Sequence, residues 1–182
     1  MVYRGCDQFR QDCSACPILR APWKSIARRE LKVKQKFRDR FQVQPIANSR
    51  WMADRLHESS LFGRVKNIPI IPPIVDAAYL AEDISDLRAE LKIPSGRLVI
   101  SRGARSLDDK YKGIPEFLTA LARVPELAGQ LTVLLFGPGQ IEIPANLDAR
   151  LLGNLADPRQ LARVYRTSDV YVSPSLMETF GM

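Results

Sequence analysis

Short apolar runs alternate with amphipathic segments in the last hundred residues of the chain. Residues 131–136 form the clearest apolar run, which is typical of a strand in a parallel sheet covered on both faces. The same pattern predicts further strands at residues 97–101, 151–152 and 169–173, and helices at residues 86–91, 114–124 and 158–165. Strands that alternate with helices predict an α/β fold with a parallel, right-handed, Rossmann-like sheet.

The first third of the chain has a different pattern. Residues 1–22 are expected to be a loop. Residues 23–41 carry apolar side chains at helical spacing with lysines and arginines between them, which predicts an amphipathic basic helix. One stripe of this helix could pack on a core, or the helix could face a membrane surface or an acceptor. Short strands are expected at residues 43–47 and 65–71, and Asn48-Ser49 is expected to cap a helix at residues 50–60.

The double proline Pro72-Pro73 predicts a stiff linker between two domains. Residues 1–71 are expected to be the C-terminal part of one domain, residues 72–82 the linker, and residues 83–182 an incomplete second domain.

Charge separates the same two regions. Residues 1–66 hold 15 Lys and Arg against 6 Asp and Glu, a net charge of +9, whereas the remaining residues hold 12 against 14, a net charge of −2. No apolar run approaches the roughly 18 residues of a membrane span, and the first residues have no apolar signal-peptide core. These observations predict a cytoplasmic protein. The basic third leaves a peripheral contact with an anionic membrane at its inner face, or a contact with nucleic acid, open.

All three cysteines, Cys6, Cys13 and Cys16, lie near the start of the chain. The spacing of Cys13 and Cys16 suits zinc, but a structural zinc site needs four ligands, and the single histidine, His57, is far away in sequence. Reduced structural thiols in a loop are the favoured interpretation, and no metal site is predicted.

The end of the chain carries the most informative motif. Pro174 ends the strand expected at residues 169–173, and the segment after Glu178 is expected to begin a helix whose free N–H groups suit a phosphate. Ligands of open α/β sheets lie at the carboxyl ends of the strands, where this loop would be. Pro174-Ser175 and Glu178-Thr-Phe-Gly181 resemble the donor-site signature of retaining glycosyltransferases of the GT-B fold, specifically family 4. The resemblance extends through Gly137-Pro-Gly139, Lys112-Gly113 and the segment from Ile71 to Asp76.

This resemblance implies the end of an N-terminal Rossmann-like domain followed by most of a C-terminal nucleotide-sugar-binding domain. The implied activity is transfer of a sugar, with retention, from a nucleoside-diphosphate sugar to a growing saccharide or a lipid-linked glycan, as in polysaccharide biosynthesis. Lys112 would neutralise the leaving diphosphate, so no metal or other cofactor is expected. An arginine, Arg102 or Arg105, would assist it, and Arg105 is slightly preferred. Glu178 would bind hydroxyls of the sugar, with ligand contacts from the backbone of Gly137, Gly139, Phe180, Gly181 and Met182.

The chain also departs from the family pattern. The family has a second glutamate about two helical turns after Glu178, which would fall beyond Met182. Its glycine-rich loop and the histidine near the reacting sugar would precede Met1, and His57 does not match that position. We therefore expect a fragment that is inactive on its own. The alternative is a non-enzymatic nucleotide- or nucleic-acid-binding module that uses the basic third, which is disfavoured because no nucleic-acid-binding motif is recognisable.

Overall fold

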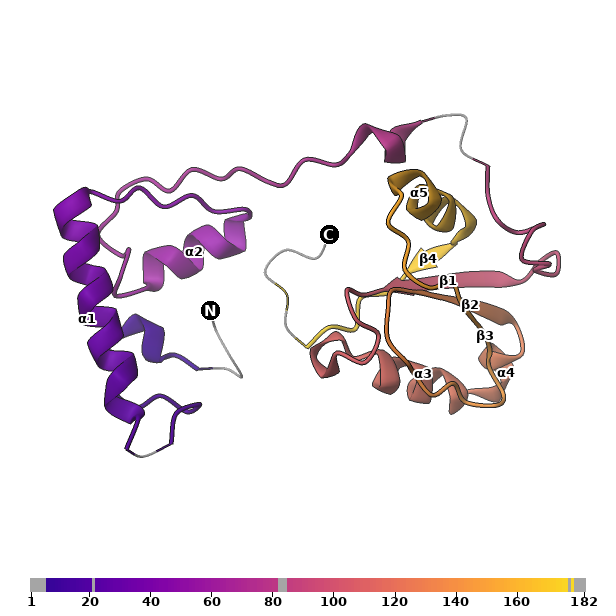
Figure 1. The fold of residues 1–182 in the computed structure, drawn as a ribbon, viewed down its shortest axis with the longest axis horizontal. Coiled ribbons are helices and arrows are strands. Elements are labelled where there is room, and N and C mark those ends of the chain that lie inside the picture. Colours follow the sequence, from indigo (N-terminus) through magenta and orange to yellow (C-terminus); the bar gives the residue numbers. More distant parts are fainter. Residues whose placement is uncertain (1–5, 21, 82–84, 177, 179–182) are drawn as a thin grey trace. The chain divides into compact units, whose positions relative to one another are not determined.

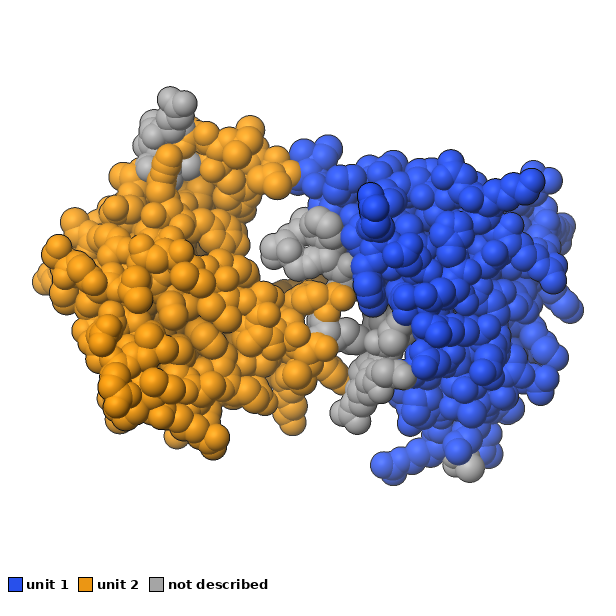
Figure 2. Space-filling view, turned by 180° about the vertical axis from the view of Figure 1, so that it is seen from behind, with its two compact units in different colours: residues 1–74, 182 blue, residues 75–181 orange. Residues whose placement is uncertain are grey.

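The computed structural model is described for residues 6–20, 22–81, 85–176 and 178 (Figure 1). The chain divides into two compact units, Met1–Ile74 and Val75–Gly181, which Figure 2 colours separately.

The first unit contains the helices α1 (Lys24–Phe41) and α2 (Arg50–Glu58) and the short 3-10 helix η1 (Gln8–Arg10). The predicted cap is present, because the Ser49 side chain accepts a hydrogen bond of 3.2 Å from the Met52 N–H. The buried core of this unit is small and consists of Ala47, Ala53 and Ile68.

The two strands expected in this unit do not form. A single parallel bridge joins Ala47 to Ile70, with hydrogen bonds of 2.9 Å from the Ala47 N–H to the Pro69 carbonyl and 2.8 Å from the Ile71 N–H to the Ala47 carbonyl. The prediction was wrong because Pro45 and Pro69 have no N–H to donate, so the ladder cannot extend past this bridge.

The predicted basic helix is confirmed as α1, but none of its residues is fully buried. Its partly covered side consists of Ala27, Leu31, Gln35 and Arg38, which follow one another at helical spacing. Gln35 donates to the Ser60 carbonyl at 3.2 Å, and Arg38 donates to the Leu61 carbonyl. The helix is therefore tied to its unit along one side only.

The second unit is an α/β domain with a four-stranded parallel sheet. Its strands are β1 (Leu98–Gly103), β2 (Leu131–Phe136), β3 (Asp148–Leu151) and β4 (Val170–Tyr171), in the order β3-β2-β1-β4. All three pairings are parallel, as the sequence pattern predicts. The architecture is Rossmann-like.

Strand β2 is buried along its whole length because helices cover both faces of the sheet (Figure 1). Leu131, Val133 and Leu135 pack in the core that contains residues of α3 (Ile114–Ala122) and α4 (Pro125–Ala128). Leu134 and Phe136 point to the other face, where the core contains Val164 of α5 (Pro158–Thr167). This alternation is the two-residue period of a strand.

Several predicted bounds need correction. Residues 86–91 form hydrogen-bonded turns instead of a helix, because the chain turns at Lys92, whose φ is +50°, and Pro94 follows. Strand β3 begins at Asp148, three residues before the predicted start, and β4 is shorter than predicted. Helix α5 is confirmed with its cap, since the Asp157 side chain accepts from the Arg159 N–H at 2.9 Å.

Candidate donor-binding site

The candidate site lies where β1 and β4 end. These strands are neighbours in the sheet, with Ile100 opposite Val170 and Ser101 opposite Tyr171. From β1 the chain continues to β2 and β3 on one side, whereas β4 lies on the other side. The strand order therefore reverses here, and open α/β sheets bind ligands in the crevice at the carboxyl ends of such a strand pair.

The loop after β1 brings Lys112 to this place. The Asp109 side chain accepts from the Tyr111 N–H at 2.9 Å and starts the short helix η3 (Lys110–Lys112). Gly113 follows with a φ of +64°, and a Cβ atom there would lie 2.4 Å from the Pro174 carbonyl oxygen. Only glycine fits this position without strain. The loop after β1 thus lies directly against the loop after β4.

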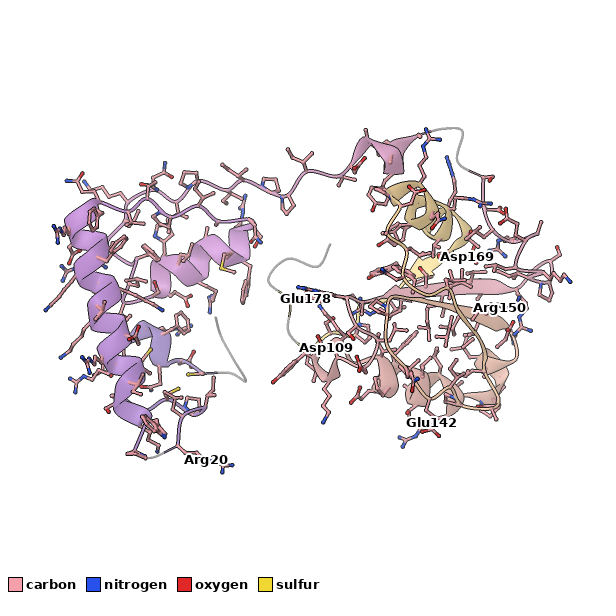
Figure 3. All side chains as sticks on the ribbon, in the orientation of Figure 1. Arg20, Asp109, Glu142, Arg150, Asp169 and Glu178 are labelled. Atoms are coloured by element: carbon pink, nitrogen blue, oxygen red, sulfur yellow. The ribbon has the colours of Figure 1, made fainter. Side chains whose placement is uncertain are left out.

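Lys112 and Glu178 form an ion pair, with Lys112 Nζ 2.8 Å from Glu178 Oε1. Figure 3 shows Glu178 and Asp109 at one end of the sheet and Asp169 toward the other. Both members of the pair stay partly accessible, with 23% and 32% of their side chains exposed. The hydrogen bond from Lys112 lowers the pKa of Glu178 against the opposing effect of burial, and Ser175 and the charge of Arg102 add to the lowering. The carboxyl group is therefore held ionised.

The two candidate arginines have different environments. Arg102 is only 3% exposed, and its side chain contacts the site from the buried side. Its Nη2 donates to Ser175 Oγ at 2.8 Å and its Nη1 to the Tyr171 hydroxyl at 2.9 Å. Arg105 is exposed on the loop after β1. Arg102 thus joins Lys112 and Glu178 in one cluster, in which two cations face one carboxylate.

Gly137 and Gly139 follow β2 with φ values of +126° and +107°. A Cβ atom on Gly137 would lie 2.0 Å from the Ala104 carbonyl oxygen, and one on Gly139 would lie 3.2 Å from the backbone N of Leu107. Both glycines therefore allow the loop after β1 to pack closely against the end of β2, and the Gly137 N–H also donates to the Gly153 carbonyl at 2.7 Å.

The remaining predicted contacts, Phe180, Gly181 and Met182, lie outside the described residues. Sequence reasoning missed the part that Tyr171 and Ser173 take in this cluster. Ser173 Oγ lies 3.5 Å from Arg102 Nη1. The alternation of residues 169–173 could have revealed both, because it places Tyr171 and Ser173 on the same side of a strand.

The three cysteines are free and half-buried. Burial raises the pKa of the Cys13 thiol, and neighbouring Cys6 and Cys16 raise it further. Within the described ranges, no group of three or more His, Cys, Asp or Glu side chains has a geometry that could hold a metal ion.

No family model matches the sequence, and no curated protein matches it either. Among solved structures, the chain is similar to the sucrose-phosphate synthase of Thermosynechococcus elongatus, a glycosyltransferase of the GT-B fold. The TM-score is 0.55 at 22% sequence identity, and the match covers 75% of this chain and 36% of the synthase chain. The chain therefore shares part of the GT-B fold of this neighbour and spans about a third of its length.

Proposed function

We propose that this chain is the donor-binding part of a retaining glycosyltransferase of family 4, which transfers a sugar from a nucleoside-diphosphate sugar to a saccharide or lipid-linked acceptor. The observation that carries the proposal is the Lys112–Glu178 pair at the carboxyl ends of β1 and β4. The GT-B fold of the structural neighbour supports it.

The cluster suits the chemistry of such a donor. When the glycosidic bond to the diphosphate breaks, negative charge grows on the phosphate oxygens, and Lys112 would neutralise it there. Glu178, held ionised, would accept hydrogen bonds from hydroxyls of the transferred sugar. With two cations and one carboxylate, the cluster has one positive charge in excess, which favours an anionic ligand.

Calorimetry with UDP, GDP and nucleotide sugars tests the proposal. Lys112→Ala should weaken the binding of both UDP or GDP and the nucleotide sugar by about 1.5–3 kcal/mol. Glu178→Ala should weaken only the binding of the nucleotide sugar, by the same amount. Lys110→Ala is the matched control, because this lysine lies in the same short helix and is exposed. Wild-type affinity in both site variants would show that the site assignment is wrong.

The first unit supplies a second proposal, for a partner surface. Trp23, Ile26, Val33, Phe37 and Phe41 are all more than 40% exposed. At about 100° per residue they fall within roughly 80° of the helix circumference. We propose that this stripe, which α1 and its N-cap residue Trp23 form, contacts an anionic membrane surface. Figure 1 shows α1 as a continuous helix, and no helix of the described chain is long and apolar enough to span a bilayer.

The charges beside this stripe support a lipid partner. Lys32, Lys36 and Arg40 lie along one flank of the stripe, as the same helical geometry places them. One acid, Glu30, falls within the stripe itself. Aromatic side chains beside a basic flank are typical of helices that lie in the membrane interface.

Co-sedimentation with vesicles of neutral lipid, with and without 30 mol% anionic lipid as a probe of roughly physiological charge, tests this surface. The wild-type chain should bind the anionic vesicles, and Lys32→Glu together with Lys36→Glu should lower that binding severalfold. Lys24→Glu, on the side toward the covered face, is the control. Equal binding to neutral vesicles, or salt-steep binding to DNA or RNA in place of vesicles, would reject the membrane assignment.

A further inference from the structure

Arg102 is a buried charge that forms no salt bridge with any described residue. It is the residue of β1 directly before Gly103, and only 3% of it is exposed. Among the described residues no carboxylate forms a salt bridge with it, and its Nε atom is buried without a hydrogen-bond partner. Burying a cation in this way costs several kcal/mol unless the surroundings supply hydrogen bonds. Whatever accepts from this guanidinium is therefore held firmly in place.

The acceptors of Arg102 all belong to the candidate site. The two short bonds go to the Tyr171 hydroxyl and the Ser175 hydroxyl, and two longer contacts of 3.5 Å reach Ser173 Oγ and the Lys112 carbonyl. Thus a single guanidinium contacts the end of β4, the loop that leads to Glu178, and the backbone of the residue that pairs with Glu178.

The other side of the cluster is also fixed. The guanidinium carbon of Arg102 lies 5.8 Å from the centre of the Tyr171 ring, and that ring meets Tyr165 of α5 edge-on at 5.6 Å. Tyr165 in turn contacts Tyr79 of the short helix η2 (Ala77–Leu80) at 6.0 Å. Burial raises the pKa of Tyr165 to about 12, so its hydroxyl stays neutral at physiological pH. Tyr171 therefore packs between the guanidinium of Arg102 and the ring of Tyr165.

The burial of Arg102 keeps its guanidinium away from a ligand that approaches from the surface. A ligand at the surface meets Lys112 and Glu178, whose side chains are 23% and 32% exposed, before it could reach Arg102. We infer that Arg102 is a positioning residue, whose buried guanidinium fixes the loops that carry Lys112 and Glu178 so that the pair is set to receive its ligand. The nature of that ligand rests on the proposed function, but the positioning itself does not.

The test compares Arg102→Met with Arg123→Met, the same change at an exposed arginine outside the candidate site. The first readout is the titration of the Glu178 carboxyl carbon by NMR. Groups that face this carboxyl are Lys112, Ser175 and Arg102. Removing the Arg102 charge should raise the pKa of Glu178 toward its ordinary value, and removing the Arg123 charge should leave it unchanged. An unchanged Glu178 titration in folded Arg102→Met would overturn the inference.

The second readout is the affinity for UDP and GDP. Arg102→Met should lose about tenfold in affinity for the nucleotide that binds. Arg102→Lys should restore the Glu178 titration but not the affinity, because an ammonium group cannot reach both hydroxyls as a planar guanidinium does. Wild-type affinity in Arg102→Lys would show that charge alone is needed and would overturn the positioning role.

A third variant, Tyr171→Phe, removes one acceptor while keeping the charge, and it serves even if Arg102→Met fails to fold. It should weaken nucleotide binding severalfold although neither Lys112 nor Glu178 is changed, and wild-type affinity would count against the inference. If neither UDP nor GDP binds the wild-type chain, the proposed function fails, whereas the Glu178 titration still decides the role of Arg102.

Discussion

The two units of the chain differ in how completely they cover their own apolar side chains. In Val75–Gly181, β2 is buried along its entire length and helices pack on both faces of the sheet. Among the described residues of Met1–Ile74, three apolar residues form the buried core, and α1 buries none of its own. The sheet unit therefore draws its stability from its own sequence, whereas the longest helix of the other unit presents an apolar stripe that its own unit leaves uncovered.

The largest expected effect is the loss of stability when a large apolar side chain in either core is replaced by alanine. Leu134→Ala, at a residue with no exposure, should lower the free energy of unfolding of the sheet unit by about 4 kcal/mol, because a cavity opens between well-packed neighbours. Ile68→Ala, in the small core of the first unit, should cost about 2 kcal/mol, because fewer packed neighbours surround the cavity.

Urea unfolding separates the two responses, because both tryptophans, Trp23 and Trp51, lie in the first unit. Tryptophan fluorescence should follow the first unit, and circular dichroism should follow the sheet as well. Leu134→Ala should shift only the circular-dichroism transition. If the two transitions coincide and both variants shift them equally, the units unfold together and the comparison fails.

The fold of the sheet unit could be predicted well from sequence because its pattern is local. The apolar run of β2, the capping aspartate of α5 and the alternation of strands with helices each follow from neighbouring residues. The strands predicted at residues 43–47 and 65–71 do not form, because their pairing depends on both segments at once. It requires N–H groups that the prolines of the two segments lack.

The candidate site divides in the same way. Lys112 and Glu178 could be named from their motifs, and the structure brings them together. Arg102 could not be placed, because whether a strand residue points into a core or toward a ligand depends on register, and a shift of one residue reverses its side. Its burial and its bonds to Tyr171 and Ser175 follow from the pairing of β1 with β4, two strands separated by most of the unit.

The contact between the loops after β1 and β4 can be broken by one methyl group. Gly113→Ala should destabilise the sheet unit by about 2 kcal/mol, because the new Cβ would meet the Pro174 carbonyl oxygen and alanine disfavours a positive φ. Gly96→Ala is the control. Its φ of +79° is similar, but no atom lies within 4 Å of its Cβ position, so it should cost only about 1 kcal/mol. Equal losses in thermal unfolding would show that the loops do not press on each other.

A smaller effect depends on pH. Asp169 Oδ2 accepts two hydrogen bonds, one from the Val99 N–H at 2.7 Å and one from Arg88 Nη2 at 2.8 Å. The first of these bonds chiefly lowers the pKa of Asp169, and the folded pKa therefore lies below the unfolded one. Asp169 thus stabilises the sheet unit above its unfolded pKa of about 3.9, and this contribution is lost as the pH falls through the folded pKa.

Asp169→Asn should accordingly cost about 1 kcal/mol at neutral pH, a figure reduced for the partial exposure of the pair. Urea unfolding, repeated at decreasing pH, should show the gap between wild type and variant closing as the pH falls below the unfolded pKa of about 3.9. Glu142→Gln, at an exposed loop residue, should show no such gap. A gap that stays constant across the range would mean that the charge of Asp169 has no part in the stability of the sheet unit.

The smallest expected effect is a change in the stability of the first unit, and its sign shows whether the apolar stripe of α1 is covered. Val33 lies in the apolar stripe of α1 and is 54% exposed. If nothing covers the stripe in solution, Val33→Ala loses little burial and gains helix propensity, so the first unit should become more stable by up to about 0.5 kcal/mol. If a second copy of the chain covered the stripe, the same change would be destabilising and dependent on protein concentration. Fluorescence-detected urea unfolding at two concentrations tenfold apart measures both the sign and the dependence. A stabilising change at both concentrations would mean that the stripe is exposed in solution and can contact a membrane. A destabilising change would mean that a second copy of the chain covers it.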